Sequence, residues 1–88
     1  MLYMVIERFK DPRAIYRRLR DEGRFLPIGL RYVSSWVEPN YDRCWQVMET
    51  DDPQHLEEWT SHWRDLAEFE IVPVLTSKEA AEAIAAQL

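Results

Sequence analysis

The segment DDPQHL (residues 51–56) has the same pattern as KDPRAI (residues 10–15), which lies 41 residues earlier in this chain of 88 residues. In both segments Asp precedes Pro, and an apolar pattern with helical spacing follows. Asp is a preferred N-cap, and Pro is favoured in the first helical turn because its missing N–H needs no partner there. Two helices are therefore predicted to begin near Pro12 and Pro53.

Four segments rich in β-branched and aromatic residues lie around the two predicted helices, at residues 2–9, 30–37, 43–50 and 69–75. This composition is typical of strands. The 41-residue offset places the first strand on the third and the second on the fourth, so the chain consists of two similar β-α-β halves. Such halves build an α+β fold, a ferredoxin-like βαββαβ sandwich with one antiparallel sheet.

The sequence also indicates where the helices end. Gly23 is a typical C-cap and should end the first helix, and the second should run to about Leu66. A third helix is expected at the C-terminus, at residues 77–88, because Thr76 and Glu79 have the spacing of a capping box. At this length the whole chain, residues 1–88, is expected to form a single ferredoxin-like domain.

The composition of the strands predicts a homodimer. Two helices can cover only one face of the sheet, yet apolar and polar residues do not alternate cleanly along the strands, and hydrophobic residues make up 47% of the chain. Both faces of the sheet are therefore expected to be substantially buried. Two sheets packed face to face in a homodimer would explain this pattern and would give a dimeric α/β barrel.

Charge and hydropathy exclude several classes of partner. The net charge is −5 and the pI is about 4.9. Nucleic acid and anionic membranes are bound mainly through Lys and Arg, so neither is an expected partner. No apolar run approaches the roughly 18 residues that cross a bilayer, and MLYMVIERF (residues 1–9) lacks the pattern of a signal peptide. The protein is expected to be soluble and cytoplasmic.

Both histidines lie in the second predicted helix. His55 and His62 are seven residues apart, about 10.5 Å along the axis, so they cannot share one metal ion whose ligands lie about 2 Å away. No metal or cofactor is expected. His62 is a candidate general acid/base, because Glu58 or Asp65 could orient its ring. A half-exposed histidine paired with one of these carboxylates is the structural alternative.

The repeat predicts which side chains share a face of the sheet. One set contains Tyr3, Val5, Glu7, Cys44, Gln46 and Met48. The other set contains Met4, Ile6, Trp45 and Val47. Because the second set is wholly apolar, it is assigned to the face beneath the helices, and the first set is assigned to the dimer interior. The residues expected to join the first set are Arg31, Val33, Ser35, Glu70, Val72 and Val74.

Polar groups among apolar ones are typical of a small-molecule pocket. The candidate ligand-binding residues in the first set are Glu7, Arg31, Gln46 and Glu70. A shift of one residue in register would bring Tyr32 and Trp36 into the pocket instead. The alternative for the charged residues is that they lie at the sheet ends in water or form ion pairs at the interface.

Three segments, GRFLPIGLRYVSSW (23–36), CWQVMETDDP (44–53) and WRDLAEFEIVPV (63–74), resemble those of an uncharacterised bacterial family of short single-domain proteins. That family is a domain of unknown function in the dimeric α/β-barrel group. The resemblance implies the ferredoxin-like fold and a homodimer. The wider group includes monooxygenases, isomerases, cyclases, heme-handling enzymes and binding proteins, and none of their catalytic motifs is matched here.

Two hypotheses of function follow. In the first, a homodimeric α/β barrel binds a small, partly apolar molecule, with or without acid/base catalysis. In the second, the protein is a non-catalytic interaction or regulatory module whose sheet face is filled entirely by the dimer contact. A cavity at the sheet interface favours the first hypothesis, and a fully packed interface favours the second.

Overall fold

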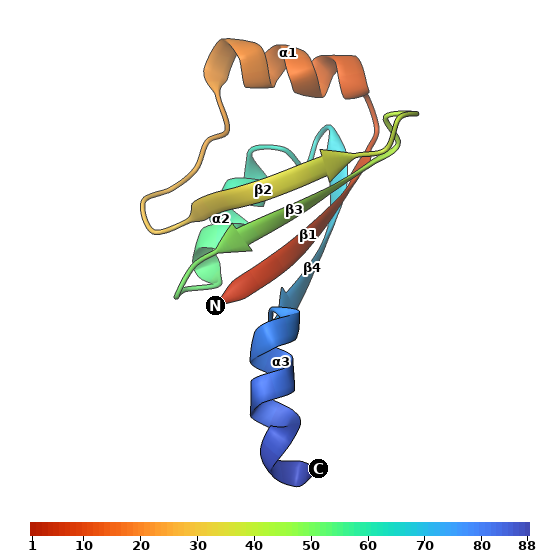
Figure 1. Cartoon of the computed structure of the whole chain (residues 1–88). Coiled ribbons are helices and arrows are strands. Elements are labelled where there is room, and N and C mark those ends of the chain that lie inside the picture. Colours follow the sequence, from red (N-terminus) through yellow and green to blue (C-terminus); the bar gives the residue numbers. More distant parts are fainter.

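The computed structural model describes residues 1–88, and its elements follow the predicted order (Figure 1). These elements are β1 (Leu2–Phe9), α1 (Pro12–Glu22), β2 (Arg31–Val37), β3 (Arg43–Glu49), α2 (Gln54–Ser61), β4 (Ala67–Val74) and α3 (Ser77–Ile84), with a short 3-10 turn at Ala85–Gln87. The four strands form one antiparallel sheet in the order β2-β3-β1-β4. The predicted ferredoxin-like α+β fold is therefore confirmed.

Both helices that pack on the sheet start where the sequence predicts. Asp11 Oδ1 accepts a hydrogen bond from the backbone N–H of Ala14 at 3.1 Å, and Pro12 is the first residue of α1. Asp52 Oδ1 accepts one from the N–H of Gln54 at 3.0 Å, at the start of α2. Each aspartate thus provides an acceptor for an N–H that has no partner inside the helix.

The second helix is shorter than predicted, because α2 ends at Ser61 and not near Leu66. The N–H groups of His62 and Trp63 bond to the carbonyl groups three residues earlier, which tightens the chain into successive turns. The physical reason is the position of β4, which already begins at Ala67. The chain reverses direction in these few residues and has no room for another regular helical turn.

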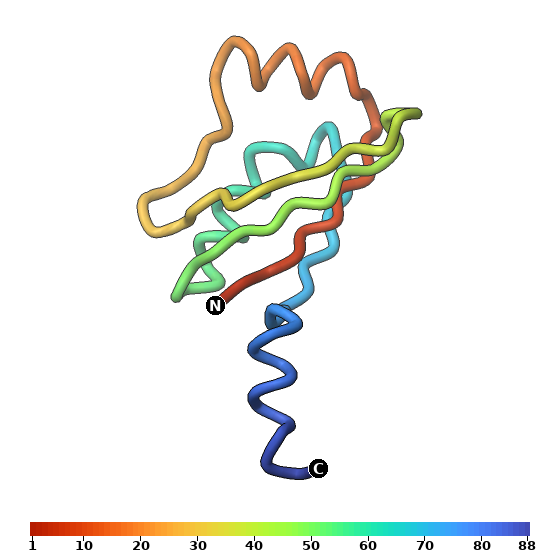
Figure 2. Tube along the Cα trace, viewed as in Figure 1, coloured from red at the N-terminus to blue at the C-terminus, as the bar shows by residue number.

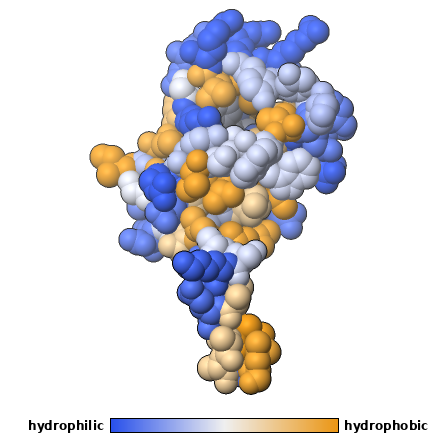
Figure 3. Space-filling view, viewed as in Figure 1, coloured by the Kyte–Doolittle hydropathy of each residue, from blue (hydrophilic) through white to orange (hydrophobic).

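The C-terminal helix α3 projects away from the sheet (Figures 1 and 2). Its predicted capping box is present: Thr76 Oγ1 accepts from Glu79 N, and Glu79 Oε1 accepts from Thr76 N, both at 3.1 Å. No residue of α3 is buried. Hydrophobic side chains are visible at its outer end in Figure 3, where Ile84 and Leu88 are exposed.

The two faces of the sheet have different surroundings. We call the face toward α1 and α2 the covered face; its side chains include Tyr3, Val5, Glu7, Phe9, Tyr32, Ser35, Val37, Cys44, Gln46, Met48, Phe69 and Ile71. We call the opposite side the bare face; its apolar side chains are Leu2, Met4, Ile6, Trp36, Trp45, Val47, Val72 and Val74. No helix covers the bare face (Figure 1).

The predicted grouping of side chains from β1 and β3 is confirmed, but its assignment to the two faces is wrong. Val5 and Met48 are fully buried and belong to the core that includes Leu56 and Trp59 of α2. The set that contains Glu7 therefore faces the helices. The physical reason is that the helices bring the large apolar side chains of this core, so the strands beneath them can present polar groups. The wholly apolar set lies on the bare face.

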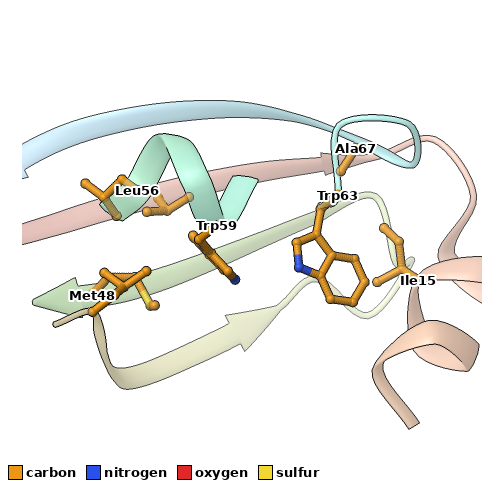
Figure 4. Close-up of a cluster of buried hydrophobic side chains, with 8 residues drawn as sticks. Ile15, Met48, Leu56, Trp59, Trp63 and Ala67 are labelled. Carbon is orange, nitrogen blue, oxygen red and sulfur yellow. The ribbon is translucent and has the colours of Figure 1, made fainter. Parts of the chain in front are cut away.

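The core contains two tryptophans from the α2 region (Figure 4). Trp59 Nε1 and Trp63 Nε1 both donate to the carbonyl oxygen of Arg24, at 3.0 and 3.1 Å. A buried indole N–H requires an acceptor, and here one carbonyl group serves both rings. The segment after α1 is thereby fixed against the α2 region. The residues on either side of Arg24 both have positive φ, Gly23 at 81° and Phe25 at 62°.

Candidate functional site

A cleft lies between α1 and the covered face of the sheet. It consists of two adjoining hollows of about 40 Å³ and about 100 Å³. The residues that line both hollows are Glu7, Ile15, Leu19, Arg24 and Gln46. An apolar cavity of roughly 150 Å³ admits one benzene molecule, so the cleft has the size for a molecule with a single ring.

The remaining walls of the cleft are largely aromatic and apolar. Those of the smaller hollow are Trp59 and Trp63, and those of the larger hollow are Phe9, Tyr16, Ser35, Val37 and Cys44. A wider depression of about 690 Å³ lies beside Tyr41, but no residue that lines it is buried. The cleft therefore combines apolar walls with buried polar groups, the usual composition of a small-molecule site.

Glu7 and Gln46 form a buried polar pair on the floor of the cleft. They lie on the adjacent strands β1 and β3, and Gln46 Nε2 donates to Glu7 Oε1 at 2.9 Å. The exposed fractions of the two residues are only 7% and 5%. Burial raises the pKa of Glu7 to about 7, although the hydrogen bond from Gln46 and the charge of Arg24 lower it. At neutral pH the carboxyl group is therefore present in both its protonated and its ionised form.

The other polar atom of Gln46 has no partner. Its Oε1 is buried and accepts no hydrogen bond. Leaving a buried acceptor unsatisfied costs about 1–3 kcal/mol, so such an atom marks a place where a further donor is expected. Because Gln46 lines both hollows, a molecule in the cleft could supply that donor.

Arg24 brings a positive charge to the same cleft. Its guanidinium carbon lies 3.9 Å from the centroid of the Tyr32 ring, a cation–π contact. Its backbone position is fixed by the two tryptophan indoles that donate to its carbonyl oxygen. Tyr32 is itself held by a hydrogen bond of 2.6 Å between its hydroxyl group and that of Ser35. The guanidinium group is thus oriented by contacts that leave its N–H donors available.

Cys44 lies next to Glu7 but is not poised as a nucleophile. Burial, followed by the nearby Glu7 carboxylate, raises the pKa of its thiol to about 12. The reactive form of cysteine is the thiolate, which is scarce at neutral pH when the pKa is this high. Cys44 therefore contributes a small apolar wall to the larger hollow.

The six predicted ligand-binding residues fall into two groups. Glu7, Gln46 and Tyr32 lie on the covered face, and the first two are brought together in the cleft. The three that lie on the bare face are Arg31, Trp36 and Glu70. Of these, Arg31 pairs with Glu49 at 2.9 Å, Trp36 lies opposite Trp45 in β3, and Glu70 lies opposite Ile6 in β1. Glu7, Arg31, Gln46 and Glu70, which were predicted to share one face, therefore lie on two different faces of the sheet.

An irregularity in β2 contributes to this division. The register between β2 and β3 shifts between Tyr32 and Ser34, so Tyr32 and Ser35 lie on the same face although they are three residues apart. A bulge of this kind changes the side of every following residue relative to strict alternation. Strict alternation would have grouped Arg31 with Ser35, as predicted from the sequence.

His62 lies outside the cleft. Its ring is exposed and stacks on Phe25, with 4.6 Å between the ring centroids and 8° between the planes. Asp65, one of its two expected partners, instead forms a paired contact with Arg18 at 2.7 and 2.9 Å. His55 is also engaged elsewhere, because its Nδ1 lies 2.9 Å from the hydroxyl oxygen of Thr50.

Arg24 is the site residue that sequence reasoning missed. It follows Gly23, where α1 ends, and continues a series of arginines that includes Arg13, Arg17 and Arg20. On sequence grounds such a series is typical of a solvated helix face. Arg24 differs from these arginines because it follows the end of α1, where the chain turns back toward the sheet.

The whole chain, residues 1–88, matches a family described as a domain of unknown function, DUF3303. The chain belongs to this family. Searches among curated proteins and among solved structures gave no match. None of the helices of the DUF3303 chain is long and apolar enough to cross a lipid bilayer.

Proposed function

We propose that this protein binds a small molecule with a single ring in the cleft, and that Glu7 exchanges a proton with the bound molecule. The observation that carries the proposal is the buried Glu7–Gln46 pair, in which Gln46 Oε1 lacks a donor. Buried polar groups are normally satisfied by protein or water. An O–H or N–H group of the ligand would supply the missing donor.

Glu7 has the property required of an acid/base group at neutral pH. General acid/base catalysis is most effective when the pKa of the group lies near the working pH, and the pKa of Glu7 is raised to about 7. The carboxylate would accept a proton from the ligand, and the carboxylic acid that forms would return it. The reaction class is therefore proton transfer, with Gln46 orienting the carboxylate and the ligand.

A homodimer formed through the bare face is the second part of the proposal. Apolar side chains from all four strands lie there without a covering helix, and a patch of this kind marks an interface. The face also carries both signs of charge, with Glu68 and Glu70 on β4 and Arg8 and Arg43 on the central strands. In a two-fold dimer the same patch meets itself, so these charges can pair between copies.

This dimer is the α/β barrel predicted from the sequence, with the cleft on the outer side of each sheet beneath α1. The cleft therefore does not depend on space at the dimer interface.

Cys44 is free and buried, which suits a reducing compartment, and we propose that the protein is cytoplasmic.

The test of ligand binding is an NMR titration of ¹⁵N-labelled protein with phenol, aniline and benzene. Phenol and aniline offer a donor to Gln46 Oε1, and benzene does not. We expect the first two to bind more tightly and to shift the indole N–H signals of Trp59 and Trp63. In Gln46→Leu this preference should disappear, whereas Trp36→Phe on the bare face should retain it. Indole signals that respond to none of the three probes would contradict the proposal.

The bare face also favours a second candidate, an interaction module without a bound ligand. In that case the exposed face and the projecting α3 would carry the function, and the cleft would only be part of the core. The two candidates differ in one measurable respect. Gln46→Leu should abolish the discrimination between phenol and benzene only if the cleft is a binding site.

A further inference from the structure

Arg24 differs from the other arginines of the chain in its surroundings. Five of the nine arginines form an ion pair with a carboxylate, namely Arg18, Arg20, Arg31, Arg43 and Arg64. Arg8, Arg13 and Arg17 are unpaired but exposed to solvent. Arg24 is the one arginine that is partly buried and has no carboxylate within 4.0 Å. A partly buried guanidinium group normally has an anionic partner.

Glu7 does not supply that partner. The charge of Arg24 acts on Glu7 strongly enough to lower its pKa, yet the two groups form no ion pair. The Glu7 Oε1 atom is occupied by the amide of Gln46. The guanidinium carbon of Arg24 lies over the Tyr32 ring, a contact that uses none of the guanidinium N–H donors.

We propose that Arg24 recognises a carboxylate group, and that the ligand of the cleft is a single-ring carboxylic acid with a hydroxyl or N–H group that reaches Gln46 Oε1. This inference rests on the proposed function and names its ligand class. The planar guanidinium group matches a carboxylate with two parallel hydrogen bonds. The ring would lie against Ile15 and Leu19, which line both hollows of the cleft.

A carboxylate fits this cleft better than a phosphate group does. The walls are mainly apolar, and transferring a doubly charged group from water into such surroundings costs more than transferring a single charge. Only one cationic side chain, Arg24, lines the two hollows. A single guanidinium group can neutralise a carboxylate but leaves a dianionic phosphate with uncompensated charge.

Isothermal titration with phenol, benzoate and 3-hydroxybenzoate tests this ligand class. We expect 3-hydroxybenzoate to bind the wild-type protein about tenfold or more tightly than phenol, because its carboxylate can form charge-assisted hydrogen bonds with Arg24 that phenol cannot form. Arg24→Gln should remove most of this preference, and Arg24→Lys should retain part of it. Arg17→Gln loses the same charge from an exposed position of α1 and should bind like the wild type.

The possible failures are distinguishable. Equal affinity for phenol and 3-hydroxybenzoate would overturn the carboxylate inference and leave the proposed binding site intact. The same holds if Arg24→Gln keeps the preference for the acid. Binding of none of the three probes would overturn both the inference and the proposed function. Fold retention in each variant is checked by the chemical shifts of the two indole N–H groups.

Discussion

The covered and bare faces of the same sheet reach their apolar character in different ways. On the covered face, α2 and the following turn supply the large side chains Leu56, Trp59 and Trp63, and the strands include the polar pair Glu7 and Gln46. On the bare face the strands themselves are apolar and no helix lies above them. A wholly apolar strand face is therefore not always the face beneath the helices. Polar residues on a covered face can indicate a binding site.

The largest difference between the faces should appear in stability. Met48 is fully buried on the covered face, and Met4 is partly exposed on the bare face. Met48→Ala should lower the free energy of unfolding by about 2–5 kcal/mol, as expected for a cavity in a core. Met4→Ala should cost less, and its effect should depend on protein concentration if the bare face is a dimer interface. Urea unfolding of each variant at two protein concentrations measures the loss of unfolding free energy. Equal losses in Met48→Ala and Met4→Ala that do not depend on protein concentration would contradict the difference between the two faces.

The second effect is a pH dependence that only the covered face should produce. The pKa of Glu7 is about 7 in the folded protein against an ordinary value of 4.5, so the folded state binds this proton more tightly than the unfolded state. Its contribution to stability is therefore complete below about pH 4.5 and is lost as the pH rises through about 7. The loss is on the order of 3 kcal/mol.

Glu7→Gln should remove this decline, because glutamine has a similar shape and does not ionise. Glu58→Gln, at an exposed position of α2, is the matched control. Its free energy of unfolding should decline with rising pH as in the wild type. The free energy of unfolding is measured in urea at about pH 5 and about pH 8. An equally steep decline in Glu7→Gln would show that another group is responsible.

The third effect concerns assembly through the bare face. Val47 lies in the centre of this face, between Met4 of β1 and Ser34 of β2. Val47→Glu would place a charge in the dimer interface and should weaken dimerisation on the order of 2 kcal/mol, about thirtyfold. Gln54→Glu adds the same charge at an exposed position of α2 and should leave the dimer unchanged. Sedimentation equilibrium measures the dimer dissociation constant of each variant. An unchanged dissociation constant in Val47→Glu would exclude the bare face as the interface.

The smallest effect should come from α3, which lies outside both faces. Thr76→Ala removes one half of the capping box with Glu79. We expect a small loss of helical circular dichroism without a shift in the main unfolding transition, because no residue of α3 is buried in the core. A clear shift of that transition would show that α3 packs against the folded body or against a second copy.

The sequence predicts the parts of this fold that depend on local hydrogen bonds. The Asp-Pro starts of α1 and α2 and the capping box of α3 are each satisfied within a few residues, so a short motif is sufficient to predict them. The internal repeat also predicts that Glu7 and Gln46 share a face, because strict alternation holds along β1 and β3. Their hydrogen bond follows from this pairing.

Other features depend on contacts that local patterns do not contain. The alternation of β1 and β3 defines two sets of side chains but does not say which set the helices cover. The irregular register of β2 separates Arg31 from the cleft and brings Tyr32 toward it. The position of Arg24 depends on two indole groups that lie 35 and 39 residues away in the sequence. None of these could be derived from spacing alone.

The most direct test of the account is a ¹³C NMR titration of the Glu7 side-chain carboxyl group, alone and with 3-hydroxybenzoate. We expect a pKa of about 7 for Glu7 in the free protein. We expect a higher pKa in the complex, because the bound carboxylate neutralises the Arg24 charge that lowers this pKa. A Glu7 carboxyl group that titrates near its ordinary value of 4.5 and does not respond to the acid would contradict the proposed site at Glu7 and Arg24.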